Sequence, residues 1–478
     1  MSTNTATLEH EIAPQRTDME IELSSDVIEK KTECDARDAA NTIEEQTVKE
    51  DSELENDAPT PSGGPKAWSY VLATFLMFIS AWGLTQVFGI FQEIYIATLL
   101  PGVSPSAISW IGSVQCFLVI VLGALTGPLF DAGYLRPLLV LGCTLIVLGM
   151  ATLSLATAYW QVFLSQSLCV GLGAGLIYVP SLALVTTLFP PSSRPWAIGC
   201  ANSGGSIGGI IFTFMLRRLV PAIGFPWAVR AVALVNLLLS IIALAIILPH
   251  RPQPTGRRRA VLDLRAFREL SFMLFALALL FNYVAFYIPA FYLPVIATKA
   301  LGQSQDFAFE SLAFVSVGSF FGRTIPMLAA SRVGSVQVYL VATLAAVVVL
   351  FSWTAIHNVA GFVIFSVVFG LISGALVAAP SAAVSHPVLA PSMSVIGTRL
   401  GILWMFGSVG VLIGAPITGA IVDVQRGYFV PGQCFAGAMV AAGSLCLIQP
   451  LTAVLRYGHW GKCGAHHQFT SLNTILNN

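Results

Sequence analysis

Arg323 is the residue whose chemistry is most unusual for its surroundings. It lies in the apolar run Ser311 to Arg332, SLAFVSVGSFFGRTIPMLAASR. A run of this length can cross the hydrocarbon core of a bilayer, where an uncompensated charge costs about 3 kcal/mol or more. An arginine at this depth is therefore expected to face a polar cavity, in which its guanidinium can bind an anion. The sequence thus predicts a binding site on a membrane-spanning helix.

The composition indicates what kind of protein surrounds this arginine. The 478 residues are 56% hydrophobic and only 10% charged, whereas about 25% of the residues in a soluble globular protein are charged. Apolar runs of about 20 residues, the length of a membrane-spanning helix, recur from Trp68 to Arg456. We therefore expect one polytopic, all-α membrane domain in a lipid bilayer, and a soluble enzyme is excluded.

Proline, glycine and charged residues divide the apolar region into twelve predicted transmembrane helices. The first six are 68–92, 106–128, 137–157, 160–182, 196–218 and 226–248, and the last six are 270–293, 310–331, 335–355, 359–383, 399–422 and 433–455. A proline- and arginine-rich linker, 249–268, separates the two sets. This arrangement is typical of transporters in which two six-helix halves, here 65–248 and 269–456, rock around a midplane site.

The charged residues predict the orientation of the chain. Residues 1–60 hold 17 acidic and 5 basic residues, a net charge of −12, so we expect 1–64 to be a disordered cytoplasmic tail, with 457–478 as a second one. With the N-terminus inside, thirteen basic residues fall on the cytoplasmic side: Lys66, Arg136, Arg194, Arg251, Arg257, Arg258, Arg259, Arg265, Arg268, Arg332, Arg399, Arg456 and Lys462. We expect a plasma-membrane protein with both termini in the cytoplasm.

Five basic residues fall on the outer side in this orientation: Arg217, Arg218, Arg230, Lys299 and Arg426. The first three form a cluster that is either an anion-attracting mouth or a set of contacts to lipid headgroups, and headgroup contact is the favoured interpretation.

The sequence does not indicate ATP binding, a cysteine-based metal site or catalysis. The glycine-rich patch Gly171-Leu-Gly173-Ala-Gly175 lacks the lysine and the strand of a phosphate loop, so ATP binding is not expected. The eight cysteines include no CxxC pair. No catalytic constellation lies at membrane depth. We expect no enzyme activity, no cofactor, no metal and no nucleic-acid partner.

The loop between spans 2 and 3 carries charges suited to gating. It reads Gly127-Pro-Leu-Phe-Asp131-Ala-Gly-Tyr-Leu-Arg136 and resembles, in degenerate form, the loop motif of the major facilitator superfamily. In that superfamily such charges latch one conformation and release in the other. The resemblance makes Asp131 and Arg136, with Arg194 at the start of span 5, candidate gating residues; the alternative is an ordinary charged loop.

Spans 5, 8 and 11 carry a more specific resemblance. Phe189, Arg194-Pro-x-Ala197-x-Gly199, Gly322-Arg323 and Gly397-Thr-Arg399-Leu-Gly401 are similar to motifs of the monocarboxylate porter family. The resemblance covers residues 62 to 456, and Phe91-Gln92-x-x-Tyr95 is similar to the fungal branch. It implies a major facilitator fold and transport by alternating access.

The predicted binding residues include two departures from that family. Its carriers of lactate-like acids have a lysine and an aspartate at the positions of Gln86 and Ser319, where this chain has groups that cannot titrate. The family's usual proton coupling is therefore not expected, while recognition of an anion by Arg323 is retained. On span 7, Asn282, Tyr283 and Tyr287 either line the cavity or join helices to one another.

The predicted function is a secondary active or facilitative transporter of the monocarboxylate porter type. Its substrate would be a small organic acid, or a related anionic or polar metabolite. Two alternatives remain: an exporter of a secondary metabolite, and a non-transporting membrane sensor or scaffold that signals through the acidic tail.

Overall fold

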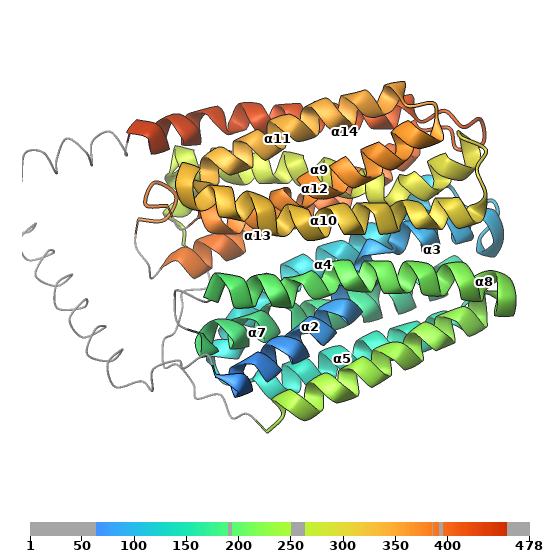
Figure 1. The fold of residues 1–478 in the computed structure, drawn as a ribbon, viewed down its shortest axis with the longest axis horizontal. Coiled ribbons are helices and arrows are strands. Elements are labelled where there is room, and N and C mark those ends of the chain that lie inside the picture. The colour runs from blue at the N-terminus through green and yellow to red at the C-terminus, as the bar shows by residue number, and fades with distance from the viewer. Residues whose placement is uncertain (1–63, 190–193, 250–262, 385, 392–394, 457–478) are drawn as a thin grey trace, which may run out of the picture. The chain divides into compact units, whose positions relative to one another are not determined.

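The computed structural model describes residues 64–189, 194–249, 263–384, 386–391 and 395–456 (Figure 1). Within these ranges the chain is helical, apart from turns and an isolated bridge between Asp423 and Tyr428. The expected all-α fold is therefore confirmed. The predicted tails, and most of the predicted linker, lie outside the described residues.

The first half of the apolar region contains nine helical elements. These are α2 Pro65–Gln86, α3 Phe88–Ile94, η1 Tyr95–Leu99, α4 Pro105–Asp131, α5 Leu135–Leu153, α6 Tyr159–Val162, η2 Phe163–Val170, α7 Gly171–Leu188 and α8 Arg194–Ile247. Helix α8 has 54 residues and is interrupted at Gly224. The φ angle of this residue is 78°, which is not a helical value. Glycine adopts this conformation without steric cost, so α8 comprises the two predicted spans 196–218 and 226–248.

The second half contains eight helical elements. These are η3 Ala266–Arg268, α9 Leu270–Lys299, α10 Gln305–Val333, α11 Ser335–Ser352, η4 Trp353–Ala355, α12 Val359–Ala383, α13 Ile396–Ile421 and α14 Val430–Cys446. In the described part of the chain, ten helices are long and apolar enough to cross a membrane. Counting the interrupted α8 twice and adding the more polar α10 accounts for all twelve predicted spans.

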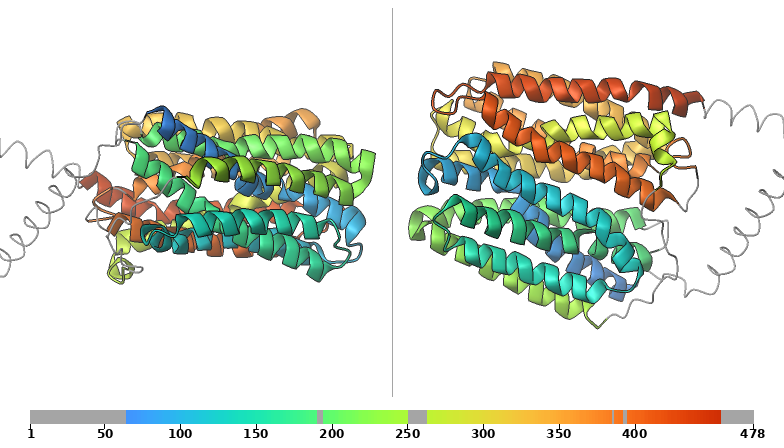
Figure 2. Two further views of the ribbon diagram at one scale, coloured as in Figure 1. Left: turned by 90° about the horizontal axis from the view of Figure 1, so that it is seen from below. Right: turned by 180° about the vertical axis from the view of Figure 1, so that it is seen from behind.

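The helices form two groups with matching contacts. Helices α2 to α8 lie on one side of the bundle and α9 to α14 on the other (Figures 1 and 2). Helix α2 packs on α8 and α4 on α7 in the first group; α9 packs on α13 and α10 on α12 in the second. The α2–α8 pair of the first group thus corresponds to the α9–α13 pair of the second, and the α4–α7 pair corresponds to the α10–α12 pair. The groups meet mainly along α4 with α13 and α8 with α10, so these four helices form the boundary at which any substrate site must lie.

The bundle has two ends, which we name by what they carry. The terminal end carries the start of α2 and, at Arg456, the end of the helical residues that follow α14. The distal end carries the interruption at Gly224 and the connections 100–104, 300–304 and 422–429.

Glycines bring α10 and α12 into backbone contact. A Cβ atom on Gly322 would lie 1.9 Å from the carbonyl oxygen of Leu371, and one on Gly370 would lie 2.2 Å from that of Val315. Such contacts leave no room for a side chain. Because packing and close approach, rather than the hydrophobic effect, join helices in a bilayer, these glycines hold the helix that carries Arg323.

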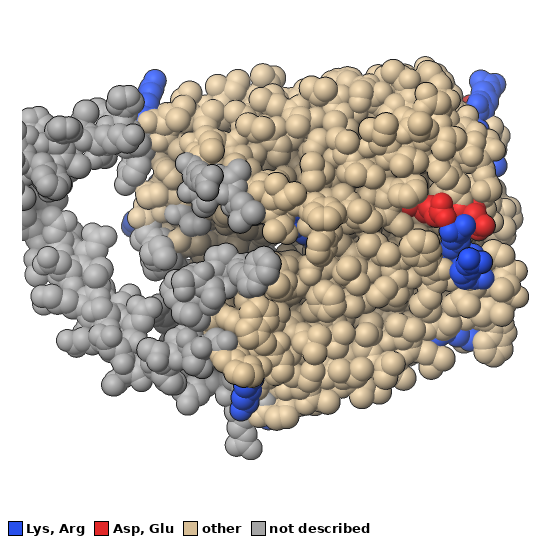
Figure 3. Space-filling model, viewed as in Figure 1, with Lys and Arg blue, Asp and Glu red and all other residues tan. Residues whose placement is uncertain are grey.

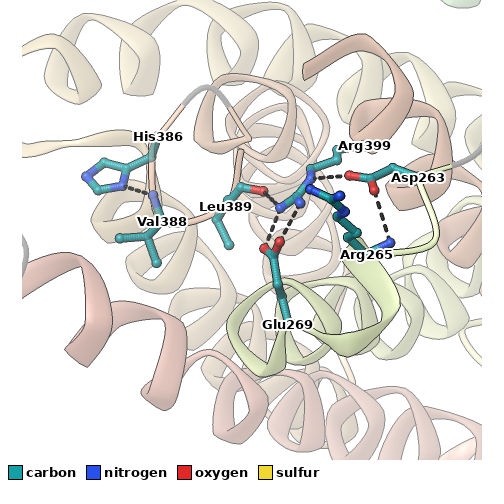
Figure 4. A network of polar contacts seen from close by, with 7 residues as sticks. All are labelled: Asp263, Arg265, Glu269, His386, Val388, Leu389 and Arg399. Carbon is teal, nitrogen blue, oxygen red and sulfur yellow. Dashed lines mark hydrogen bonds and ion pairs between the residues drawn. The ribbon is translucent and has the colours of Figure 1, made fainter. Parts of the chain in front are cut away.

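A buried arginine fixes the start of α13 at the terminal end (Figure 4). Arg399 is 1% exposed, and its two terminal nitrogens each donate to a carboxylate oxygen of Glu269 at 2.5 Å. Its Nε donates to Asp263 at 3.0 Å, and Nη1 also donates to the carbonyl of Leu389 at 2.8 Å. The network ties α13 to the segment that precedes α9. A buried guanidinium is tolerated only with such partners.

Replacing Gly322 by alanine should destabilise the bundle, because the new methyl group would overlap the Leu371 carbonyl. We expect a loss of about 1–3 kcal/mol, typical of overpacked cores, measured by thermal unfolding of the purified protein in detergent. Gly199→Ala is the matched control, since a Cβ there meets nothing within 4 Å. Equal stability of the two variants would contradict the proposed role of Gly322.

Glu269→Gln should lower the free energy of unfolding by about 3 kcal/mol, because it removes one charge from a buried ion pair. Asp423→Asn tests the same chemistry at the surface: Asp423 and Arg426 have side chains 43% and 86% exposed, and the loss should be below about 1 kcal/mol. Denaturant titration in mixed micelles measures both. A smaller effect at Glu269 than at Asp423 would show that the buried network is not stabilising.

Candidate functional site

Arg323 lies where the two helix groups meet. Its Nη1 donates to the backbone carbonyl of Asn202 on α8 at 2.9 Å, so the side chain spans from the second group to the first. The residue is partly exposed, but its Nε is buried without a hydrogen-bond partner. The guanidinium therefore has unused donor capacity in a poorly solvated position.

The acidic residues of the described chain are all engaged elsewhere. Asp263 and Glu269 pair with Arg399, Asp306 and Glu310 with Arg217, and Asp423 with Arg426, while Glu93 accepts a hydrogen bond from Gln305. None of these carboxylates is within ion-pair distance of Arg323. The side chain of Asp131 lies outside the described residues.

Aromatic side chains lie near the guanidinium. Tyr178 on α7 and Tyr283 and Tyr287 on α9 are near enough to interact with Arg323 electrostatically. Tyr178 makes an edge contact with Trp82 at 5.2 Å between ring centroids, and Tyr283 stacks on Phe286 at 5.0 Å. We call Trp82, Tyr178, Tyr283 and Phe286 the ring cluster. Three of its members, Trp82, Tyr178 and Phe286, are partly exposed.

Gly205 on α8 makes room for this arrangement. A Cβ atom at that position would lie 2.8 Å from the Cβ of Trp82 and 3.5 Å from Nη1 of Arg323. The absence of a side chain thus allows α2, α8 and α10 to approach one another at the site.

Two further predicted residues lie on the helices that border the site. On α8, Gly209 faces both Gln86 and Ser316: a Cβ atom there would be 3.3 Å from the Cβ of Gln86 and 2.6 Å from Oγ of Ser316. Gly209 is four residues beyond Gly205, which faces the guanidinium, so Gln86 lies about 6 Å, one helical turn, from the guanidinium level toward the distal end. Ser319 is buried, with its carbonyl oxygen facing Gly374 of α12.

Asn282 points away from Arg323. Its Nδ2 donates to the hydroxyls of Tyr339 at 2.7 Å and Thr343 at 3.2 Å, both on α11. This placement favours the helix-joining alternative for Asn282. Tyr283 and Tyr287, by contrast, lie near Arg323, so the three predicted residues of span 7 have different neighbours.

The gating residues are only partly described. The side chains of Asp131 and Arg194 lie outside the described residues, and Arg136 is half-buried in the first turn of α5. Gating by these charges stays a prediction.

Two of the three clustered arginines at the distal end, Arg217 and Arg230, have protein partners. Arg217 forms ion pairs with Asp306, at 3.6 Å, and with Glu310, while Arg230 lies over the ring of Trp227 at 4.5 Å. For Arg217 these ion pairs replace the expected contact with headgroups. Figure 3 shows acidic and basic side chains side by side at one end of a face, a few basic ones at the other end, and a middle part almost free of charge.

Sequence reasoning did not identify Trp82, Tyr178 or Phe286. A signal existed for one of them: Phe286 is three residues after Tyr283, a spacing that places both on one helix face. No local pattern distinguishes Tyr178, because its role depends on how α7 is rotated against α10.

Comparison with known proteins identifies the family. A model of the Major Facilitator Superfamily matches residues 69–415. The MFS-type transporter dbaD of Emericella nidulans is 35% identical, over 80% of this chain and 85% of its own length. The Aspyridones efflux protein apdF of the same species is 32% identical, over 81% of this chain and 78% of its own.

A solved structure shows the same fold. The nucleoside transporter NupG superposes with a TM-score of 0.61 and 17% identity, covering 81% of this chain and 99% of NupG. At this level of identity the likeness concerns the fold alone. The family match and the fold agree with the twelve spans and their paired contacts: the chain belongs to the Major Facilitator Superfamily and is a multi-pass membrane transporter.

Proposed function

We propose that the protein exports an organic anion across the plasma membrane by alternating access, as a transporter of the monocarboxylate porter type. The observation that carries this proposal is the position of Arg323. Its guanidinium joins the two helix groups, and no described carboxylate neutralises it. A substrate carboxylate or acidic enol would be its counter-ion.

The position of the charge suits alternating access. A substrate held between two groups of helices contacts both, so its binding and release are linked to their relative movement. Arg323 already contacts Asn202 across this boundary. An anion at Arg323 would satisfy the buried Nε, which has no partner now, and this adds a reason for the site to favour anions.

The ring cluster supports a substrate with a flat, conjugated body. Aromatic rings stack with planar groups, and Trp82, Tyr178 and Phe286 of this cluster are partly exposed. Gln86 and Ser319 cannot exchange a proton with the substrate. The substrate would therefore bind as the anion, and a conjugated acid fits both its charge and its surroundings.

Export as the direction of transport is supported by a relative that is described as an efflux protein. The excess of basic residues at the terminal end favours a cytoplasmic position for that end under the positive-inside rule. We assign the distal end to the outside of the cell.

Arg323→Gln should reduce efflux of labelled conjugated acids from whole cells or vesicles at least 10-fold, because it removes the substrate's counter-ion and retains an amide of similar size. Arg323→Lys keeps the charge but loses the fork of donors, so an intermediate loss is expected. Arg426→Gln, at the exposed distal surface, is the matched control. Wild-type flux through Arg323→Gln at equal surface expression would rule out this site.

Tyr178→Leu should raise the KM for an aromatic acid by roughly 2- to 10-fold, the loss expected when one ring contact is removed. The KM for an aliphatic acid of the same charge should change little, and Tyr178→Phe should resemble the wild type. Concentration-dependent uptake into inverted vesicles measures all three. An equal loss for aromatic and aliphatic acids would contradict the role of the ring cluster.

A further inference from the structure

Glu93 is the one buried carboxylate in the described part of the chain, with 6% of its surface exposed. It lies on α3, one residue beyond the predicted first span and at the distal end of the bundle. The transport site described above has no titratable carboxylate of its own. Glu93 therefore offers a kind of chemistry that Arg323, Gln86 and Ser319 lack.

The partner of Glu93 belongs to the opposite helix group. Nε2 of Gln305, at the start of α10, donates to Oε2 of Glu93 at 3.0 Å, and Lys299 at the end of α9 contributes a positive charge nearby. Helix α3 precedes α4 in the first group, whereas α9 and α10 belong to the second. The Glu93–Gln305 bond thus closes the boundary between the groups.

Further bonds close the distal end around Glu93. Arg217 of α8 pairs with Asp306 and Glu310 of α10, and Ser106 of α4 donates to the carbonyl of Pro416 on α13 at 2.8 Å. The remaining polar side chains packed near α3 are Gln92, Tyr95, Ser109, Gln166 and Tyr292, which bond among themselves. We call the Glu93–Gln305 and Arg217–Asp306–Glu310 contacts the distal latch.

Opening the distal end would change the surroundings of Glu93. Separation of the helix groups breaks its bond to Gln305 and brings water to the carboxylate. Burial penalises the ionised form of a carboxyl group more than the neutral form. In the closed structure burial raises the pKa of Glu93, and the hydrogen bond from Gln305 and the charge of Lys299 lower it by less.

The sign of the pH effect follows from this difference. Glu93 binds a proton more tightly when the distal end is closed than when water surrounds the group. A fall in pH therefore favours the closed state, and a rise in pH favours opening, between the pKa values of the open and closed states. One linked proton changes the ratio of open to closed molecules by at most about tenfold per pH unit.

We infer that Glu93 is a proton-binding site that controls the distal latch. Uptake of a proton stabilises the closed distal end, and loss of the proton permits opening. In an exporter, protonation from the outer medium after substrate release would return the protein to the state that loads from the cytoplasm. This inference goes beyond the proposed function, since it needs no particular substrate.

The latch is tested by measuring the distance between its two sides as pH varies. Spin labels at Ala97 on η1 and Arg426 in the α13–α14 connection, both exposed, would report on the two groups in full-length protein without substrate, with accessible native cysteines replaced by serine. We expect the long-distance population of the otherwise wild-type protein to grow as pH rises. Glu93→Gln, which imitates the protonated form, should hold the short distance at every pH.

Three further variants test whether the pH response of the distance depends on Glu93. Asp423→Asn removes another carboxylate of the distal end and should keep the wild-type response. The distance between the labels should also depend on pH in Glu93→Asp, which keeps a carboxylate. Gln305→Leu should enlarge the open population more at high pH than at low pH, because the ionised carboxylate of Glu93 loses its hydrogen-bond donor. A wild-type pH response in Glu93→Gln, or loss of the response in Asp423→Asn, would overturn the inference whether or not the protein exports an organic anion.

Discussion

The constraint on which this structure depends is the cost of placing a charge in a medium of low dielectric constant. Only seven acidic residues follow residue 60, and each of the six described ones has a partner. Arg399 is buried with two carboxylates, and Arg217 joins two more across the boundary of the helix groups. Arg323 is partly buried with a single backbone acceptor. Because every other charge in the described bundle is either compensated or at its surface, the one incompletely satisfied guanidinium marks the position at which a ligand would be most stabilising.

Close backbone packing at two glycines determines where Arg323 lies relative to the neighbouring helices. Gly322 immediately precedes Arg323 and lies against α12, while Gly205 lies against Trp82 at the opposite side of the guanidinium. Glycine costs helix stability in water, but in a bilayer it allows the close contacts that hold helices together. The same residues that appear in the sequence as motif glycines thus determine how far the arginine is from the rings near it.

Much of this architecture was predictable, and the remainder was not, for physical reasons. Span positions depend on local hydropathy, so all twelve were predicted, including α10 with its internal arginine. The partners of that arginine depend on how helices rotate about their axes, which side-chain periodicity determines poorly when a helix is apolar on all faces. Asn282 and Tyr283 are adjacent in sequence, yet Asn282 bonds to α11 while Tyr283 lies near Arg323 of α10. Tyr178 and Glu93 acquire their importance only from residues more than ninety positions away.

Helices α8 and α10 touch at three levels: Asn202 with Arg323, Gly209 with Ser316, and Arg217 with Glu310. The outermost levels are separated by 15 residues on α8, or about 22 Å of continuous helix. If the two helices tilted against each other about the Gly209–Ser316 contact, the contacts on either side of it would move in opposite directions. Binding of an anion at Arg323 would then alter the distal ion pairs, although the helix between them keeps its secondary structure.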